Sequence, residues 1–186
     1  MSKSISESAV GLELVRLNRS HIELGLAWKF QVNPDSCDNP EHYEEYIKFH
    51  AVRDCLDGRG TTHILVEDEK ILGYITFKAS CLTRRYDGSD LPEGDPALEI
   101  AELAISTEAE NMGYASLLVQ YSFVISGEIN QNQLGIRYIT LCADPKAVGF
   151  YEKHGFKRIE EWQEIPREGW NKNCIPMFIR VPDLPN

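Results

Sequence analysis

The segment from Leu98 to Ala143 constrains the fold more than any other part of the chain, because it places two strand patterns around one helix pattern. Leu98–Ile105 and Ile136–Ala143 are short and apolar, as buried strands are. The apolar residues between them recur at helical spacing, at Leu117, Leu118, Tyr121, Val124 and Ile125. A strand, a helix and a strand in this order predict helices packed against a sheet.

The remaining segments add strands and two helices near the start. Gly11–Leu17 alternates apolar residues and predicts a first strand, with Asn18 placed to cap the helix that follows. Thr62–Val66 and Ile71–Phe77 flank the charged turn Glu67–Lys70, which is typical of a hairpin. The other predicted elements are helices over His21–Phe30 and Glu41–Leu56 and strands over Phe156–Trp162 and Ile175–Val181. This order predicts an α/β fold, with helices flanking one α+β mixed sheet.

One long polar segment separates the hairpin from the buried strand at Leu98. Ser80–Pro96 is rich in Gly, Pro and Asp, which predicts a surface loop. Loops of this length in compact domains are often functional. We therefore expect this segment to form a lip of a substrate site.

The length and the net charge limit the classes of protein to which this chain can belong. The 186 residues can bury a core as one domain, residues 1–186, without a metal or a disulfide. Lys and Arg number 19 and Asp and Glu 29, so the formal net charge is −10. Such a charge repels phosphate and attracts cations, which makes nucleic acid an unlikely partner and favours a small-molecule or peptide amine as substrate. The sequence leaves open whether the chain forms a homodimer.

The cysteines and the apolar runs bear on the compartment. The five cysteines are odd in number and lack the close spacing of zinc or redox motifs, so we expect free buried thiols and no metal. Their positions are Cys37, Cys55, Cys81, Cys142 and Cys174. The first ten residues lack an apolar signal region, and no run approaches the roughly 18 apolar residues of a membrane span. A cytoplasmic protein without membrane contact is expected.

The junction between the buried strand and the long helix has the composition of an anion site. It reads Glu110-Asn111-Met112-Gly113-Tyr114-Ala115. Gly113 and the small Ala115 let a ligand approach the backbone, and the first turn of a helix offers free amides to a pyrophosphate. A turn with small residues for packing is an equally good explanation of the junction taken alone.

A second motif follows the second buried strand. Asp144 can cap a short helix, Pro145 fits its first position and Gly155 its end. The run Ala147–Phe156 resembles the A-x-x-F/L-Y-E-K-x-G-F signature of the GNAT superfamily of N-acetyltransferases. The junction before it resembles the Q/R-x-x-G-x-G/A pyrophosphate loop of that family, and the similarity extends from about Thr62 to Val181.

The resemblance implies a fold, a cofactor and a set of site residues. A GNAT-like fold has a mostly antiparallel mixed sheet of about six to seven strands, splayed between the fourth and fifth, with about four helices. The co-substrate would be acetyl-CoA, and the reaction a direct transfer of acetyl to a primary amine in a ternary complex. Residues that would bind the coenzyme are Leu103, Ala104, Ile105, Asn111, Met112, Gly113, Tyr114, Ala115, Ser116, Asp144 and Phe150.

Two glutamates and one tyrosine are the candidate catalytic residues. Glu99 and Glu102 lie in an apolar strand, where a carboxylate is costly unless it is paired or functional. Residues three apart face opposite sides of a regular strand, so both can face the site only if a bulge intervenes. The resemblance favours Glu99 as the base and places Tyr151 where it would protonate the departing thiolate. Pairing of either glutamate with a cation across the sheet is the alternative.

Two departures from the family pattern leave other functions open. Glu110 stands where the family has Gln or Arg, and Asp144 where Asn is common. Both fit helix caps, but they also allow a non-catalytic acyl-CoA-binding module or sensor. A third hypothesis is a toxin-type enzyme that acetylates aminoacyl-tRNA. The five histidines show no ligand spacing, so we expect them to have packing or surface roles. They are His21, His42, His50, His63 and His154.

Overall fold

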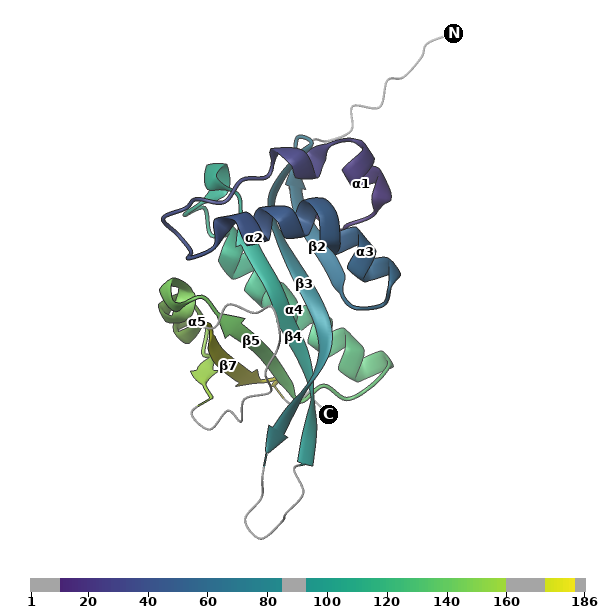
Figure 1. The fold of residues 1–186 in the computed structure, drawn as a ribbon. Helices are drawn as coiled ribbons and strands as arrows, with labels where there is room; N and C mark the ends of the chain where they lie inside the picture. The colour runs from purple at the N-terminus through teal and green to yellow at the C-terminus, as the bar shows by residue number, and fades with distance from the viewer. Residues whose placement is uncertain (1–10, 85–92, 160–172, 183–186) are drawn as a thin grey trace.

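A seven-stranded sheet organises the described part of the chain, in the strand order β1-β2-β3-β4-β5-β7-β6 (Figure 1). The computed structural model describes residues 11–84, 93–159 and 173–182. The strands are β1 (Glu13–Arg16), β2 (Thr61–Glu67), β3 (Lys70–Arg84), β4 (Glu93–Ile105), β5 (Tyr138–Ala143), β6 (Lys157–Arg158) and β7 (Ile175–Arg180). The helices are α1 (Arg19–Glu23), η1 (Leu26–Lys29), α2 (Pro40–Glu45), η2 (Tyr46–His50), α3 (Ala51–Leu56), η3 (Thr107–Ala109), α4 (Tyr114–Asn132), η4 (Pro145–Ala147) and α5 (Val148–Lys153). The predicted mixed α/β fold is confirmed.

The sheet opens between its fourth and fifth strands, as the resemblance implied. β4 and β5 pair in parallel only over Ala97–Ile100 and Tyr138–Leu141. The other neighbouring strands pair antiparallel. Beyond Ile100, β4 continues along β3 and β5 continues along β7, so the edge of β4 at Ala101–Ile105 faces a gap.

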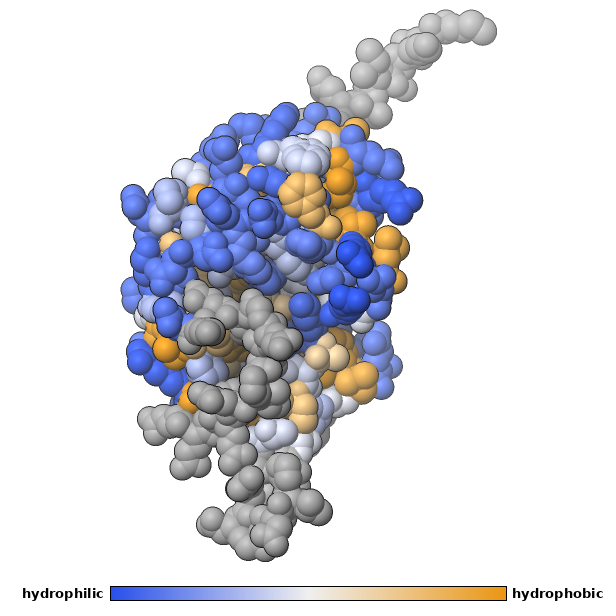
Figure 2. Space-filling view, in the orientation of Figure 1, coloured by the Kyte–Doolittle hydropathy of each residue, from blue (hydrophilic) through white to orange (hydrophobic). Residues whose placement is uncertain are grey.

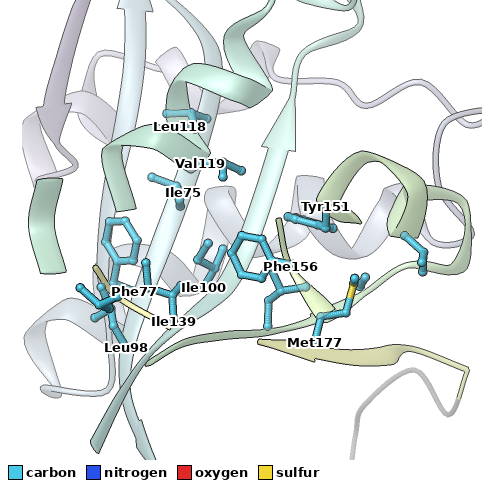
Figure 3. Packing of buried hydrophobic residues seen from close by; sticks show 14 of the residues in the cluster. Ile75, Phe77, Leu98, Ile100, Leu118, Val119, Ile139, Tyr151, Phe156 and Met177 are labelled. Carbon is cyan, nitrogen blue, oxygen red and sulfur yellow. The ribbon is translucent and has the colours of Figure 1, made fainter. Parts of the chain in front are cut away.

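Two apolar cores lie on opposite faces of the sheet. Leu118 and Val119 of α4 lie beside Ile75 of β3 in one core, which also contains Phe77 (Figure 3). The other core joins the helices before β2 to the opposite face; its fully buried side chains include Phe30, Ile47, Ile64 and Tyr74. In Figure 1, α2 and α3 cross in front of the strands while α4 runs behind them. Burial on both faces therefore fixes the sheet between two helical layers.

Local signals account for most of the elements near the start of the chain. The Asn18 side chain accepts a hydrogen bond from the His21 amide and begins α1, as predicted. The predicted helix over His21–Phe30 is wrong in one respect, because Gly25, with a φ of 76°, separates α1 from η1. The predicted hairpin is confirmed: Asp68 and Glu69 adopt the left-handed conformation between β2 and β3.

The predicted surface loop over Ser80–Pro96 is largely wrong. β3 extends to Arg84 and β4 begins at Glu93, and the two pair throughout, so only residues 85–92 of this segment lie outside the described chain. The side chains alternate between exposed and buried at Cys81 and Leu82. Polar composition suggested a loop because one face of this hairpin meets water. The pairing of its backbone groups makes it a strand nevertheless.

The surface over α2 and α3 is mostly hydrophilic, with hydrophobic side chains gathered at the edge beside α1 and α3 (Figure 2). No helix in the described ranges is long and apolar enough to span a bilayer. The end of the predicted strand over Phe156–Trp162 falls outside those ranges, and its described part contributes Lys157 and Arg158 to β6.

Candidate functional site

The first turn of α4 is open at its amino end. Gly113 occupies the N-cap position with a φ of 85°, and no side chain caps the helix. The first intrahelical bond runs from the Leu117 amide to the Gly113 carbonyl at 3.1 Å. The amides of Tyr114, Ala115 and Ser116 therefore have no acceptor inside the helix, and the helix dipole adds partial positive charge at this end. Backbone of this kind binds phosphate groups.

A cavity of about 640 Å³ connects this helix end to the gap in the sheet. We call it the α4 cavity. Its wall includes the free edge of β4 at Leu103, Ala104 and Ile105. The other predicted coenzyme residues that line it are Asn111, Gly113, Tyr114, Ala115, Ser116, Asp144 and Phe150. Met112 does not line it and its side chain is 60% exposed.

A second cavity of about 580 Å³, the α2 cavity, adjoins the first. The helical segment from α2 to α3 lines it on one side, with Lys78 of β3 opposite. Both cavities have five residues in common: Tyr43, Ala101, Glu102, Cys142 and Asp144. The two spaces therefore meet beside Glu102, where the strands part.

A β-bulge turns both glutamates of β4 to the same face. Thr76 pairs with Glu102 and the next residue, Phe77, pairs with Ile100, so Ala101 has no partner of its own. Leu98 and Ile100 pack on the α4 side before the bulge, and Leu103 and Ile105 do so after it. Glu99 and Glu102 consequently both lie on the α2 side of the sheet.

Only one of these glutamates reaches the cavities. Glu102 lines both, whereas Glu99 is 7% exposed and lines neither. The Glu102 carboxylate also meets His42 of α2, whose Nε2 lies 3.1 Å from each carboxylate oxygen. This contact raises the pKa of His42, against an opposing effect of burial. Glu102, rather than Glu99, is thus the glutamate at the meeting point of the two cavities.

Tyr151 reaches the α4 cavity from α5. Its ring packs edge-on against Phe156 with centroids 5.7 Å apart (Figure 3). Burial raises the pKa of Tyr151 well above the ordinary value of a phenol, and the charges of Glu102 and Asp144 raise it further. The phenol therefore keeps its proton throughout the physiological range.

The two departures from the family pattern have structural roles here. The Glu110 carboxylate accepts a hydrogen bond from the side-chain amide of Asn33 at 2.8 Å. Asp144 accepts hydrogen bonds from the amides of Lys146, at 2.9 Å, and of Asp38, at 2.8 Å. It thus caps η4, as predicted, and also holds the loop before α2.

The prediction of five free buried thiols is wrong. Cys142 and Cys174 form a disulfide at the wall of the α2 cavity. Cys37 is free and buried, Cys55 is free and half-buried, and Cys81 is free and exposed. The sequence hid the disulfide because its cysteines are 32 residues apart, and the antiparallel pairing of β5 with β7 brings them together.

His42 is the site residue that the sequence interpretation missed. The histidines were judged by their spacing from one another, and His42 instead meets a carboxylate 60 residues away. A weak signal was present. His42, Tyr46, His50 and Asp54 recur every four residues, and all four line the α2 cavity. No group of three or more potential metal ligands occurs in the described part of the chain.

An open helix end, a gap between parallel strands and a buried phenol define a class of protein that binds an acyl coenzyme and transfers its acyl group. Residues 58–158 match the model of the acetyltransferase (GNAT) domain. The chain belongs to this family. No curated protein matches the sequence.

Solved structures of bacterial toxins are similar to this chain. A Tyr-to-Phe mutant of the toxin AtaT, bound to acetyl-CoA and the C-terminus of the antitoxin AtaR, has a TM-score of 0.67 at 19% identity over 92% of this chain and 94% of that one. AtaT complexed with acetyl-methionyl-tRNAfMet has a TM-score of 0.70 at 20% identity over 91% and 95%. The KacTA–DNA complex has a TM-score of 0.63 at 19% identity over 92% and 94%.

These neighbours overturn one expectation. A small-molecule or peptide amine substrate, with nucleic acid an unlikely partner, was predicted from the net charge of −10. Proteins of this fold are described in complexes with tRNA, DNA and an antitoxin. A net charge is an average over the surface, and binding depends on the local field. Lys153, Lys157 and Arg158, for example, are exposed on α5 and β6, where Arg158 pairs with Glu152 at 2.9 Å.

Proposed function

We propose that this chain transfers the acetyl group of acetyl-CoA to the amino group of an aminoacyl-tRNA. The observation that carries the proposal is the junction of two cavities at Glu102, one of which ends at the open first turn of α4. The family match supports the acetyl transfer, and the tRNA complex of a protein with the same fold supports the acceptor.

The α4 cavity is the place proposed for acetyl-CoA. The pyrophosphate would accept hydrogen bonds from the amides that open α4, and the pantetheine arm would pair with the edge of β4 at Leu103–Ile105, as an added strand does. No metal is required, because backbone dipoles hold the charge. The thioester would then lie where the two strands part.

The α2 cavity is the place proposed for the aminoacyl end of the acceptor. An α-amino group has a pKa of about 8, so freeing it at pH 7 costs about 1.4 kcal/mol, against roughly 4 kcal/mol for an alkylamine. Glu102 would take one proton from the ammonium, and the free amine would then attack the thioester carbonyl carbon. As the carbon–sulfur bond breaks, Tyr151 would give its proton to the departing thiolate, and the second proton lost by the nitrogen would restore the phenol.

The local distribution of charge is compatible with an acceptor that carries phosphate groups, although the net charge is negative. Residues 144–159 carry the basic side chains Lys146, Lys153, Lys157 and Arg158 against the acidic Asp144 and Glu152. Lys146 also lines the α4 cavity. The acidic residues of the α2 cavity would meet only the cationic amino end of the acceptor.

The test is transfer of labelled acetyl from acetyl-CoA to aminoacylated tRNA. We expect label in the charged tRNA fraction, loss of label after the ester is hydrolysed, and none in uncharged tRNA. Tyr151→Phe should bind acetyl-CoA but transfer slowly. Binding of acetyl-CoA without transfer to any charged tRNA would refute the proposed acceptor, and absence of acetyl-CoA binding would refute the transferase itself.

A further inference from the structure

Four side chains from one helical stretch line the α2 cavity. His42, Tyr46, His50 and Asp54 are each four residues apart and come from α2, η2 and α3. In a regular α-helix, a spacing of four drifts around the axis by about 40° at each step. The π-helical turn η2 (Tyr46–His50) is wider, which offsets this drift. The irregular turn therefore keeps these side chains on one face, above the sheet.

The first of these four side chains contacts the glutamate that the two cavities share. The Nε2 atom of His42 lies 3.1 Å from Oε1 and 3.1 Å from Oε2 of Glu102. The ring nitrogen is thus shared between the two oxygens, and this contact holds the carboxylate beside the imidazole. The Glu102 side chain is 12% exposed and that of His42 is 48% exposed. His42 thus holds a nearly buried carboxylate from the side that faces water.

Neighbouring charges act on the protonation state of His42. Glu45 favours the charged form of His42 and Lys78 of β3 opposes it. The other titratable groups of the α2 cavity are Tyr43, Tyr46, His50, Asp54 and Asp144. Lys78 lies 3.8 Å from Asp54, so its charge is partly offset. On the side of the sheet gap, the charge of Glu102 acts on Tyr151.

Building on the proposed transfer reaction, we propose that His42 is a positioning residue that holds the Glu102 carboxylate toward the amine and controls its readiness to accept a proton. The proton leaves the ammonium nitrogen and bonds to one oxygen of Glu102, while the His42 N–H donates to the other oxygen. No bond forms to His42. When both ring nitrogens are protonated, the positive charge of His42 pairs with the carboxylate and competes with the amine for its oxygens.

The relationship predicts a pH dependence. The contact with Glu102 raises the pKa of His42 above 6.5. Below this raised pKa the charged ring pairs with the carboxylate and withholds it from the amine, and it releases the carboxylate as His42 loses its second proton. The acidic limb of kcat should therefore lie above pH 6.5 in the wild type. A side chain at position 42 that donates a hydrogen bond but does not titrate should keep the rate and lose this limb.

The experiment compares His42→Gln with His42→Leu in the labelled acetyl transfer assay. The rate is measured from about pH 5.5 to about pH 8.5 at saturating acetyl-CoA. We expect His42→Gln to keep kcat within about 3-fold at pH 8 and to flatten the acidic limb. His42→Leu should lower kcat by about 10- to 100-fold with the KM for acetyl-CoA unchanged, because a misplaced base loses its alignment. His21→Gln is the matched control. It lies at the N3 position of α1, where Gln also serves in a capping box, and should change neither quantity.

A second measurement separates failure of this inference from failure of the proposed function. The histidine ring signals in NMR report the pKa of His42 without turnover, and Glu102→Gln should lower it. An inactive wild type would overturn the transfer reaction and the positioning role together. If the wild type is active, two results would overturn the inference alone. One is a wild-type rate and pH profile in His42→Leu, and the other is a pKa of His42 that Glu102→Gln leaves unchanged.

Discussion

The side-chain amide of Asn33 donates a hydrogen bond of 2.8 Å to the carboxylate of Glu110, a residue 77 positions later in the chain. Glu110 is three residues before Gly113, the glycine that leads into α4. A carboxylate free to turn toward the amides of that turn would compete with a pyrophosphate for them. The contact with Asn33 instead directs the carboxylate toward the loop before α2.

This contact predicts how acetyl-CoA affinity responds to mutation. Asn33→Ala frees the Glu110 carboxylate and should raise the Kd of acetyl-CoA by about 3- to 10-fold, while Glu110→Gln should leave it unchanged or lower it. The double variant should return to the affinity of Glu110→Gln, which calorimetry can measure. Equal weakening in Asn33→Ala and in the double variant would show that Asn33 acts independently of Glu110.

The left-handed Gly113 provides a second test. An alanine at a φ of 85° is strained by about 1–2 kcal/mol, so Gly113→Ala should tilt the first amides of α4 and weaken acetyl-CoA binding. Gly127→Ala is the matched control in the same helix. Its added methyl group meets nothing within 4 Å, and alanine should stabilise the helix by about 0.5–1 kcal/mol with unchanged binding. Thermal unfolding and calorimetry on both variants test this pair.

Tyr151→Phe should lower kcat by about 100- to 10,000-fold while the Kd of acetyl-CoA stays close to that of the wild type. Burial keeps the pKa of Tyr151 above its ordinary value of 10, so the wild-type rate should show no basic limb from this group below pH 10. A basic limb near pH 8 that disappears in Tyr151→Phe would contradict this.

The disulfide predicts a redox-dependent stability. The Cys142–Cys174 bond spans a sequence separation of 32 and should contribute about 3–4 kcal/mol to the free energy of unfolding. Its reduction, or the double change to Ala, should lower the Tm by about 6–15 °C in a chain of this size. Cys81→Ser, at an exposed free thiol, should change the stability by less than about 0.5 kcal/mol. A reduced protein with unchanged Tm would show that the bond adds no stability.

A half-buried histidine predicts acid sensitivity. The Nδ1 atom of His63 is buried and has no hydrogen-bond partner among the described residues, and its ring packs on Phe77 and Tyr121. Burial lowers its pKa below 6.5, so the unfolded chain binds the proton more readily than the folded one. The resulting stability is present above pH 6.5 and is lost as the pH falls, by at most about 1.4 kcal/mol per unit. In urea unfolding at pH 7.5 and 5.5, His63→Leu should lose less stability than the wild type.

Local patterns in the sequence determined the elements of the sheet, the hairpin turn at Asp68 and Glu69, the glycine turn before α4 and the cap at Asp144. Each of these depends on a few neighbouring residues, so composition and spacing suffice to predict it. The polar hairpin after Ser80 was missed because its strand state depends on a partner strand rather than on its own residues.

Tertiary structure alone decided which glutamate reaches the cavities and which residues accompany it. The choice of Glu102 depends on the bulge at Ala101, which arises from pairing between two strands. The His42 contact, the Asn33 contact and the Cys142–Cys174 bond join residues that lie far apart in sequence. Such contacts form only when packed layers fix the relative positions of their elements, so no local pattern encodes them.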